Sequence, residues 1–366
     1  MSNPAGDWRP TASTATLAQR AALLARAREF FARRGVLEVD TPLLIGTAVT
    51  DVHIHSARVE LDTGARPLSL ATSPEYAMKR LLAAGSGDIY QISHVVRAGE
   101  RSRLHNPEFT LIEWYRLGFT LDALMNEVQA LARELLGAPR DARAGAGSAA
   151  PGAVRRSERI TYRDAFLRVL GLDPLTADIA ELERAAGRHG FVATREKQPT
   201  PPKDRATTRD KGATAREEHA SPADSHPDRE LLLDFLMGAV IGPALGLGAL
   251  TFVHGYPASQ AALAELDPHD PRVALRFELY CEGIELANGF RELASSAEQR
   301  ARFECDRQER ARRGLQVPEM DERLLAALDA GLPPCSGVAL GFDRLLMIAL
   351  GARHIDEVLA FPIERA

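Results

Sequence analysis

The chain has 366 residues, of which 45% are hydrophobic, and a formal net charge of -5 at pH 7. This length allows one large domain or two with a well-buried core, and the acidic balance excludes a protein that binds nucleic acid through overall positive charge. The three cysteines lack CxxC spacing, and neither an apolar leader nor an apolar run of about 18 residues is present, so we expect a cytoplasmic protein without disulfides, zinc or a membrane segment.

The N-terminal part is predicted to begin with a helix. Apolar residues recur at helical spacing over residues 17–34, and Gly35 is a natural end for that helix. We expect a strand over residues 36–39 and a strand-rich region over residues 51–70.

A polar helix start follows at Ser73, Pro74 and Glu75. Ser73 is predicted to cap the helix, Pro74 to occupy its first position, and Glu75 to complement its positive end. The helix should run to Ala84. A cap alone is the ordinary interpretation of such a triplet, and a ligand site at the helix start is the alternative.

The stretch from Arg97 to Arg116 concentrates chemically useful side chains. Arg97 provides fixed positive charge, His105 and Asn106 provide polar edges, and Phe109 provides a flat aromatic face. This combination suits a nucleoside triphosphate, because cations bind phosphate while an aromatic ring and polar groups bind the base. A charged turn between two strands is the alternative.

The middle of the chain contains two polar interruptions. After a helix predicted over residues 120–136, residues 137–157 are rich in Gly, Ala and Pro and are predicted to form a linker-like surface loop. Residues 194–228 are charged and almost without large apolar side chains, so they are predicted to be a disordered insertion. The resemblance described below implies that the whole chain, residues 1–366, forms a single catalytic domain around them.

A two-residue turn at Glu282 and Gly283 predicts a hairpin. That register places Glu285 opposite Tyr280, and therefore Glu278 and Glu285 on one face. Neighbouring carboxylates repel each other unless a cation lies between them, so Mg²⁺ is one interpretation and a solvent-facing strand side is the other. A bulge at residues 288–289 would turn Glu292 toward the same face.

The C-terminal part is predicted to contain a charged helix over residues 297–313 and then a buried strand that leads into an apolar helix over residues 337–351. Small residues at Gly337, Ala339 and Gly341 leave one strand face bare, which allows a flat ligand or a second backbone to approach. Helices and adjacent strands without βαβ alternation favour an α+β fold.

These segments, in this order, resemble the class II aminoacyl-tRNA synthetases, and within them the lysyl type. Residues 30–44 look like motif 1, residues 95–116 like motif 2 and residues 337–347 like motif 3, while residues 72–82 and 283–293 match lysine-site segments. The resemblance implies an α+β catalytic core with a largely antiparallel six-stranded sheet flanked by helices. It also implies a homodimer built through motif 1.

The same resemblance implies ATP and Mg²⁺ as cofactors. The implied catalytic residues are Arg97, at the α-phosphate, and Arg344, at the far phosphates. The implied ATP-binding residues are Arg97, Ala98, Gly99, Glu100, His105, Asn106, Phe109, Glu285, Leu286, Gly341 and Arg344. The implied substrate-binding residues are Ser73, Pro74, Glu75, Tyr115, Asn288, Glu292 and Ala339, with Glu292 and Tyr115 at the ε-ammonium. The implied metal ligands are Glu278 and Glu285.

The sequence departs from the lysyl type at two points, and these change what we expect of its adenine contacts and of tRNA binding. Gly99 stands where that family has an adenine-contacting Glu, and Glu100 is the candidate substitute. Motif 1 begins near residue 30, which leaves no room for an anticodon-binding domain of about 100 residues, so we expect no stable tRNA binding.

A lysyl-type core without an anticodon-binding domain resembles the elongation factor P lysine ligase family. Ala339 supports this resemblance, because lysyl synthetases typically carry Gly at that position. The family implies that (R)-β-lysine, or lysine, is activated by ATP and attached to a lysine of elongation factor P. A minimal lysyl-tRNA synthetase, another diamino-acid ligase and a non-catalytic paralogue are the alternatives.

Overall fold

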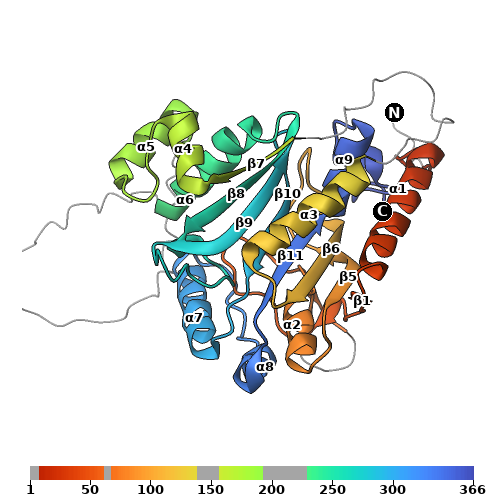
Figure 1. Ribbon diagram of the computed structural model, residues 1–366, viewed down its shortest axis with the longest axis horizontal. Helices are drawn as coiled ribbons and strands as arrows, with labels where there is room; N and C mark the ends of the chain where they lie inside the picture. The colour runs from red at the N-terminus through yellow and green to blue at the C-terminus, as the bar shows by residue number, and fades with distance from the viewer. Residues whose placement is uncertain (1–7, 62–66, 138–155, 193–228) are drawn as a thin grey trace, which may run out of the picture.

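The computed structural model describes residues 8–61, 67–137, 156–192 and 229–366. Its centre is an eight-stranded sheet with the strand order β1-β5-β6-β11-β10-β9-β8-β7 (Figure 1). The strands are β1 Leu37–Glu38, β5 Ile89–Val96, β6 Glu108–Leu117, β7 Arg156–Thr161, β8 Ala249–Pro257, β9 Val273–Cys281, β10 Ile284–Arg291 and β11 Cys335–Gly341.

The predicted α+β class is confirmed, but the expected number of six strands is wrong. The six central strands, β5-β6-β11-β10-β9-β8, are antiparallel to one another. The short β1 and the strand β7 then extend the sheet at its two edges by parallel pairing. These edge strands are less apolar than the centre, and the sequence gives a weaker signal for them.

Three helices cover the face of the sheet that α3 crosses in Figure 1, which we call the back face, and their apolar sides form the main core with it. They are α1 Thr14–Ala32, α3 Leu121–Leu136 and α9 Phe342–Leu350. Trp114 of β6 and Leu340 of β11 point into this core and are fully buried. Because side chains alternate along a strand, the neighbours Glu113, Tyr115 and Ala339 point to the opposite, front face.

Two further clusters flank the front face. Helix α2 (Glu75–Ala83) packs with α7 (Ser296–Arg312) and α8 (Glu322–Gly331) around Met78 and Phe303. At the β7 edge, α4 (Tyr162–Leu170), α5 (Ile179–Arg188) and α6 (Arg229–Phe235) pack against β8, and α6 continues as a π-helical turn, η1 (Leu236–Ile241). Short 3₁₀ turns cover Gly242–Ala244 (η2), Ala258–Gln260 (η3) and Ile355–Val358 (η4). The site described below lies between these clusters.

Several predicted element ends shift by a few residues. Helix α1 begins at Thr14 because Ser13 caps it, accepting a hydrogen bond from the Thr16 amide at 3.1 Å. The predicted strand-rich region shrinks to β3 (Arg58–Val59) and β4 (Leu68–Leu70), which join β2 (Leu44–Ile45) in a small second sheet. The helix over residues 120–136 and the strand-to-helix segment at residues 337–351 are confirmed within one or two residues.

The predicted start of α2 needs a correction. Pro74 is the N-cap, and Glu75 is the first helical residue. Ser73 is not the cap, although its hydroxyl accepts a hydrogen bond from the Glu75 amide at 3.0 Å. The Ser73 hydroxyl donates in turn to the Glu113 carboxylate at 2.8 Å, which ties the helix start to β6.

The predicted hairpin of β9 and β10 is confirmed, with Glu285 opposite Tyr280. Both turn residues, Glu282 and Gly283, have positive φ, as a type I′ turn requires. The bulge expected at residues 288–289 lies instead between Glu285 and Ala287. This earlier bulge shifts the alternation of β10 and keeps Glu285 and Glu292 on the front face with Glu278.

Both predicted polar interruptions fall mainly on residues 138–155 and 193–228, which lie outside the described residues. Residues 156 and 157, at the end of the predicted linker, already belong to β7. Within the described part of the chain, no helix combines the length and the apolar character that spanning a membrane would need.

Candidate active site

A cavity of 190 Å³ opens on the front face where β6, β11 and β10 lie side by side. Six of the seven predicted substrate-binding residues line it: Ser73, Glu75, Tyr115, Asn288, Glu292 and Ala339. The seventh, Pro74, borders two neighbouring hollows instead. Residues more than 200 positions apart in the sequence therefore meet because strand pairing places Ala339 between Glu113 and Asn288.

The inner wall of this cavity is a buried cluster of charge. The Lys79 Nζ atom lies 2.8 Å from a Glu75 carboxylate oxygen and 2.6 Å from one of Glu292. Both Lys79 and Glu292 have side chains that are 1% exposed. Glu113 lies beside them, accepting hydrogen bonds from the Tyr115 hydroxyl at 2.7 Å and from the Ser73 hydroxyl at 2.8 Å. Two carboxylates thus share one lysine, and a third lies beside them with two hydroxyl partners.

Burial and mutual repulsion shift the pKa values of this cluster. Burial, with the charge of Glu75, raises the pKa of Glu113 to about 8. Burial also raises the pKa of Glu292 to about 7, although the neighbouring Lys79 partly offsets this. Burial alone would lower the pKa of Lys79, but the charges of Glu292 and Glu75 outweigh it and raise that pKa. Without a further cation the cluster limits its negative charge by holding protons on Glu113 and Glu292, and a cationic ligand would favour their ionised forms.

Lys79 and Glu113 were not among the residues predicted from the sequence. Glu113 is two residues before Tyr115 on one strand, so the alternation of β6 would have placed both on the same face. Lys79 is one helical turn after Glu75, which is the spacing of an intrahelical ion pair. What the sequence does not reveal is that Glu292, more than 200 residues later, shares this lysine.

The second part of the site is the loop that connects β5 to β6. Arg97 begins it, and its guanidinium lies 5.2 Å from the centre of the Phe109 ring and donates a hydrogen bond to the Thr72 carbonyl at 3.3 Å. Arg97 also lines the 190 Å³ cavity, so it stands at the junction of the two parts. Ala98 is fixed by its amide, which donates to the His55 carbonyl at 2.7 Å, and Gly99 has a φ of +82°.

Glu100 is the candidate for the adenine-contacting role of the Glu that Gly99 replaces. Its carboxylate points toward Arg97, and the nearest nitrogen–oxygen distance between the two side chains is 3.9 Å. Asn106 is buried, and its side-chain amide donates to the Glu108 carbonyl at 2.7 Å and accepts from the Ile363 amide at 3.1 Å. Asn106 therefore shapes the loop.

Arg344 brings the distant segments of the nucleotide side together. Its guanidinium donates to the Glu285 carbonyl at 3.0 Å, lies 3.5 Å from the Glu285 carboxylate, and is hydrogen-bonded to His105 Nε2. Burial and the positive charges of Arg344 and Arg97 lower the pKa of His105 to about 4, so its ring is neutral near pH 7 and accepts from Arg344. Gly341 lies next to Arg344 and Leu286, and an added Cβ would make only ordinary contacts there, at 3.8 Å from both Arg344 Cδ and the Leu286 carbonyl oxygen.

The two predicted metal ligands share a face, but they differ in surroundings. Glu278 accepts hydrogen bonds from Arg276 at 2.6 Å and from the Tyr280 hydroxyl at 2.7 Å. Glu285 is 39% exposed at its side chain, and desolvation together with the charge of Glu278 raises its pKa. Among the described residues, no group of three or more His, Cys, Asp or Glu could hold a metal ion by itself. Arg276, which the sequence analysis did not select, lies between Glu278 and Asn288.

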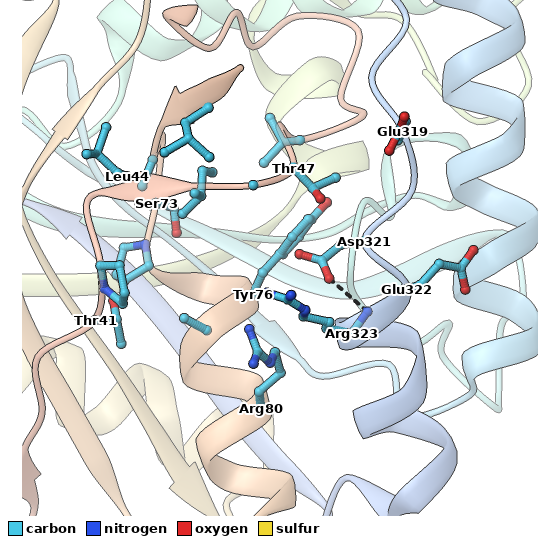
Figure 2. Close-up of a pocket in the computed structure, with 18 of the residues that line it drawn as sticks. Thr41, Leu44, Thr47, Ser73, Tyr76, Arg80, Glu319, Asp321, Glu322 and Arg323 are labelled. Atoms are coloured by element: carbon cyan, nitrogen blue, oxygen red, sulfur yellow. Dashed lines mark hydrogen bonds between the residues drawn. The ribbon is translucent and has the colours of Figure 1, made fainter. Parts of the chain in front are cut away.

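A larger hollow of 530 Å³ adjoins the site on the far side of Ser73 and Tyr76. Figure 2 shows Tyr76 at its centre, with Thr41 and Leu44 on one side and Asp321 and Glu322 on the other. It contains part of the segment that resembles motif 1, and its carboxylates, Glu319, Asp321 and Glu322, all come from one short segment, unlike those of the smaller cavity.

Comparison with known proteins gives a consistent result. A family model described as tRNA synthetases class II (D, K and N) matches residues 1–365. A curated protein of Vibrio cholerae, "Elongation factor P--(R)-beta-lysine ligase", is 47% identical over 364 residues, which cover 98% of this chain and 99% of the relative. Proteins of the same name from Vibrio vulnificus and Proteus mirabilis are 46% and 45% identical, and each alignment covers at least 97% of both chains.

Proposed function

The chain belongs to the family of class II tRNA synthetases (D, K and N) and, within it, to the elongation factor P--(R)-beta-lysine ligases, and we propose that it joins (R)-β-lysine to a lysine side chain of elongation factor P at the expense of ATP. The carrying observation is the small cavity in which Glu75 and Glu292 share Lys79 and a third carboxyl, Glu113, lies beside them on hydroxyl partners. A substrate with two ammonium groups supplies the missing positive charge.

The cavity explains the preference for a diamino acid. A buried carboxylate cluster without enough cations is costly by several kcal/mol, and an amino acid with an apolar side chain would leave that cost in place. We assign the distal ammonium to Glu292 and Tyr115 and the other amino group to Glu75. Ala339 lies at the cavity wall, and its small side chain leaves room for the carbon chain that joins the two ammonium groups of the substrate.

The first reaction step takes place where the cavity meets Arg97. The substrate carboxylate attacks the α-phosphorus of ATP in line, which forms the acyl-adenylate and releases pyrophosphate. Arg97 stabilises the charge that develops at the α-phosphate, and Arg344 binds the far phosphates. Phe109, beneath the Arg97 guanidinium, offers its ring to adenine.

In the second step, the neutral ε-amine of the acceptor lysine attacks the carbonyl carbon of the adenylate. A C–N bond forms, the C–O bond to AMP breaks, and the amine releases a proton. No protein nucleophile is needed, so catalysis consists of positioning and charge stabilisation.

Glu285 and Glu278 fit a divalent cation, because desolvation and the charge of Glu278 raise the pKa of Glu285 and the Glu285 side chain is exposed. Bound with ATP, Mg²⁺ would neutralise phosphate charge and orient the pyrophosphate leaving group. Arg276 would hold Glu278 in place through its 2.6 Å contact.

We further propose a cytoplasmic homodimer. Leu44, which lines the hollow of Figure 2, is 41% exposed, and Leu43, which lines a neighbouring hollow, is 43% exposed; a second copy would cover both. Sedimentation at several concentrations measures this directly, and a monomer at all concentrations would contradict it.

The test of the proposed function is ATP–pyrophosphate exchange with (R)-β-lysine and with L-α-lysine, followed by mass spectrometry of elongation factor P and of lysine tRNA after incubation. We expect exchange to favour (R)-β-lysine and mass to be added to the protein. Transfer to tRNA would make the chain a minimal lysyl-tRNA synthetase, and no exchange with any amino acid would make it a non-catalytic paralogue.

Gly337→Ala is expected to raise the KM for (R)-β-lysine by about tenfold or more with little change in the KM for ATP. A Cβ at Gly337 would lie 2.3 Å from the Tyr115 ring and 2.5 Å from a Glu292 carboxylate oxygen, so both side chains must move. Gly187→Ala on α5, where a Cβ meets nothing within 4 Å, is the matched control. Unchanged affinity for the amino acid in Gly337→Ala would contradict the assignment of this wall.

The KM for (R)-β-lysine is expected to fall several-fold as pH rises from about 6.5 to about 8.5. The pKa values of Glu292, about 7, and Glu113, about 8, both lie in this range, so the two carboxyls hold protons at its lower end and add negative charge beside the bound ammonium groups only as they lose them. Steady-state kinetics over this range measures the effect, and Glu113→Gln should reduce the slope at the upper end of the range, where Glu292 is already ionised. A profile that keeps its slope in Glu113→Gln would assign the titration to another group.

A further inference from the structure

The turn of the β5–β6 loop, residues 101–106, is docked onto the C-terminal segment of the chain. The Ile355 amide donates to the Arg103 carbonyl at 2.9 Å, and the Ile363 amide donates to Asn106 at 3.1 Å. Arg103 also donates to the Arg353 carbonyl at 3.2 Å. Ile355 belongs to η4 and is 2% exposed in the main core, so this segment is a rigid support.

Arg101 makes most of the side-chain hydrogen bonds between the loop turn and the C-terminal segment. Its guanidinium forms two parallel hydrogen bonds with the Asp356 carboxylate, at 2.9 and 2.8 Å, and two with the Glu364 carboxylate, at 2.5 and 2.7 Å. It also donates to the His105 carbonyl at 3.3 Å. Isolated surface ion pairs contribute little to stability. A planar guanidinium that binds two carboxylates, each through two hydrogen bonds, forms a network and contributes more.

The contacts continue from Arg101 to Arg344. Ser102 and His105 pair through their backbones, and the Ser102 hydroxyl lies 2.6 Å from His105 Nδ1. His105 Nε2 accepts from the Arg344 guanidinium, as described above, and Arg344 donates to the Leu104 carbonyl at 3.4 Å. The loop turn therefore supplies two of the contacts that orient Arg344, and Glu285 of β10 supplies the others.

We propose that Arg101, clamped by Asp356 and Glu364, is a positioning residue that holds the β5–β6 loop turn, and through His105 the Arg344 guanidinium, in the orientation that receives ATP. The inference rests on the proposed function for the identity of the ligand. Arg101 acts through its neighbours: its donors face the two carboxylates and the His105 carbonyl. Its loss should therefore weaken ATP binding more than it slows the reaction of bound ATP.

The experiment is ATP–pyrophosphate exchange with Arg101→Ala, Asp356→Asn and Glu364→Gln in the full chain. We expect Arg101→Ala to raise the KM for ATP by about tenfold and to keep kcat within about twofold, with smaller increases for the two carboxylate variants. Arg101→Lys should rescue little, because an ammonium cannot hold two carboxylates in fork geometry. Arg300→Ala, which removes a two-bonded pair with Glu322 on α7 and α8, is the control and should leave the KM for ATP unchanged.

A second readout does not depend on activity. Amide hydrogen exchange without ATP should be faster at residues 102–106 in Arg101→Ala and in Glu364→Gln than in the unchanged chain. A folded Arg101→Ala variant with an unchanged KM for ATP, or with unchanged exchange at these amides, would overturn the clamp. If the unchanged chain shows no ATP–pyrophosphate exchange, the proposed function fails, while the hydrogen-exchange comparison still decides whether the clamp exists.

Discussion

Glu292→Gln is expected to lower kcat/KM for (R)-β-lysine in adenylate formation by roughly 10²- to 10³-fold. Removing one member of a buried charge network costs about 3–5 kcal/mol, and about 1.4 kcal/mol corresponds to a factor of ten in rate. Glutamine keeps the shape of the side chain, so the loss comes from charge. The substrate's distal ammonium would then meet a neutral amide at the position where the proposal puts its counter-ion.

The contacts of Glu292 make the variant informative. Its carboxylate already binds Lys79 at 2.6 Å, and Lys79 keeps Glu75 as a second partner after the substitution. The fold should therefore survive, because no cation is left without a partner and a carboxyl with a raised pKa is removed from the interior. Urea unfolding of the variant measures this, and the KM for ATP should stay close to that of the unchanged chain.

Glu265→Gln is the matched control for Glu292→Gln. Glu265 forms an ion pair with Arg291 at 3.3 Å and is 38% exposed, so its charge is largely solvated. A folded Glu292→Gln variant that retains more than about a third of the activity with (R)-β-lysine would remove Glu292 from substrate recognition. The same loss in Glu265→Gln would indicate a general electrostatic effect.

Part of the site could be predicted from local rules, whereas the roles of most of its residues were implied by the resemblance to the lysyl type. The hairpin of β9 and β10 followed from the turn at Glu282 and Gly283, and its register fixed the faces of Glu278 and Glu285. The bare strand face of β11 followed from the small residues that alternate along it. In each case the signal is contained within a dozen residues.

The missed features depend on contacts between distant segments. Lys79 pairs with Glu75 one turn away, but the third member, Glu292, reaches it only because β10 bends at its bulge. That bulge was predicted two residues too late, since the strand continues through Gly289 without interruption. The clamp on Arg101 joins residues more than 250 positions apart, and such pairs leave no periodic pattern in the sequence.

Arg97→Ala is expected to lower kcat for adenylate formation by about 10²- to 10³-fold, the cost of losing one preorganised donor at a developing charge. Arg97 is the cation shared by the amino-acid cavity and the nucleotide loop. The in-line attack of a carboxylate on the α-phosphate brings two anionic groups together, and their repulsion is greatest in the transition state. A fixed cation at that point lowers the barrier more than it strengthens the binding of either reactant.

Arg97→Lys separates charge from geometry in the same experiment. Lysine restores positive charge but lacks the planar fork, so we expect it to recover only part of the lost rate. Single-turnover formation of the adenylate measures this step directly, and Arg159→Ala, which removes a surface pair with Asp122, controls for loss of an arginine elsewhere. If Arg97→Ala changed only the KM for ATP and left the single-turnover rate intact, Arg97 would bind ground-state nucleotide, and the stabilisation of the transition state would have to come from Arg344 and the metal.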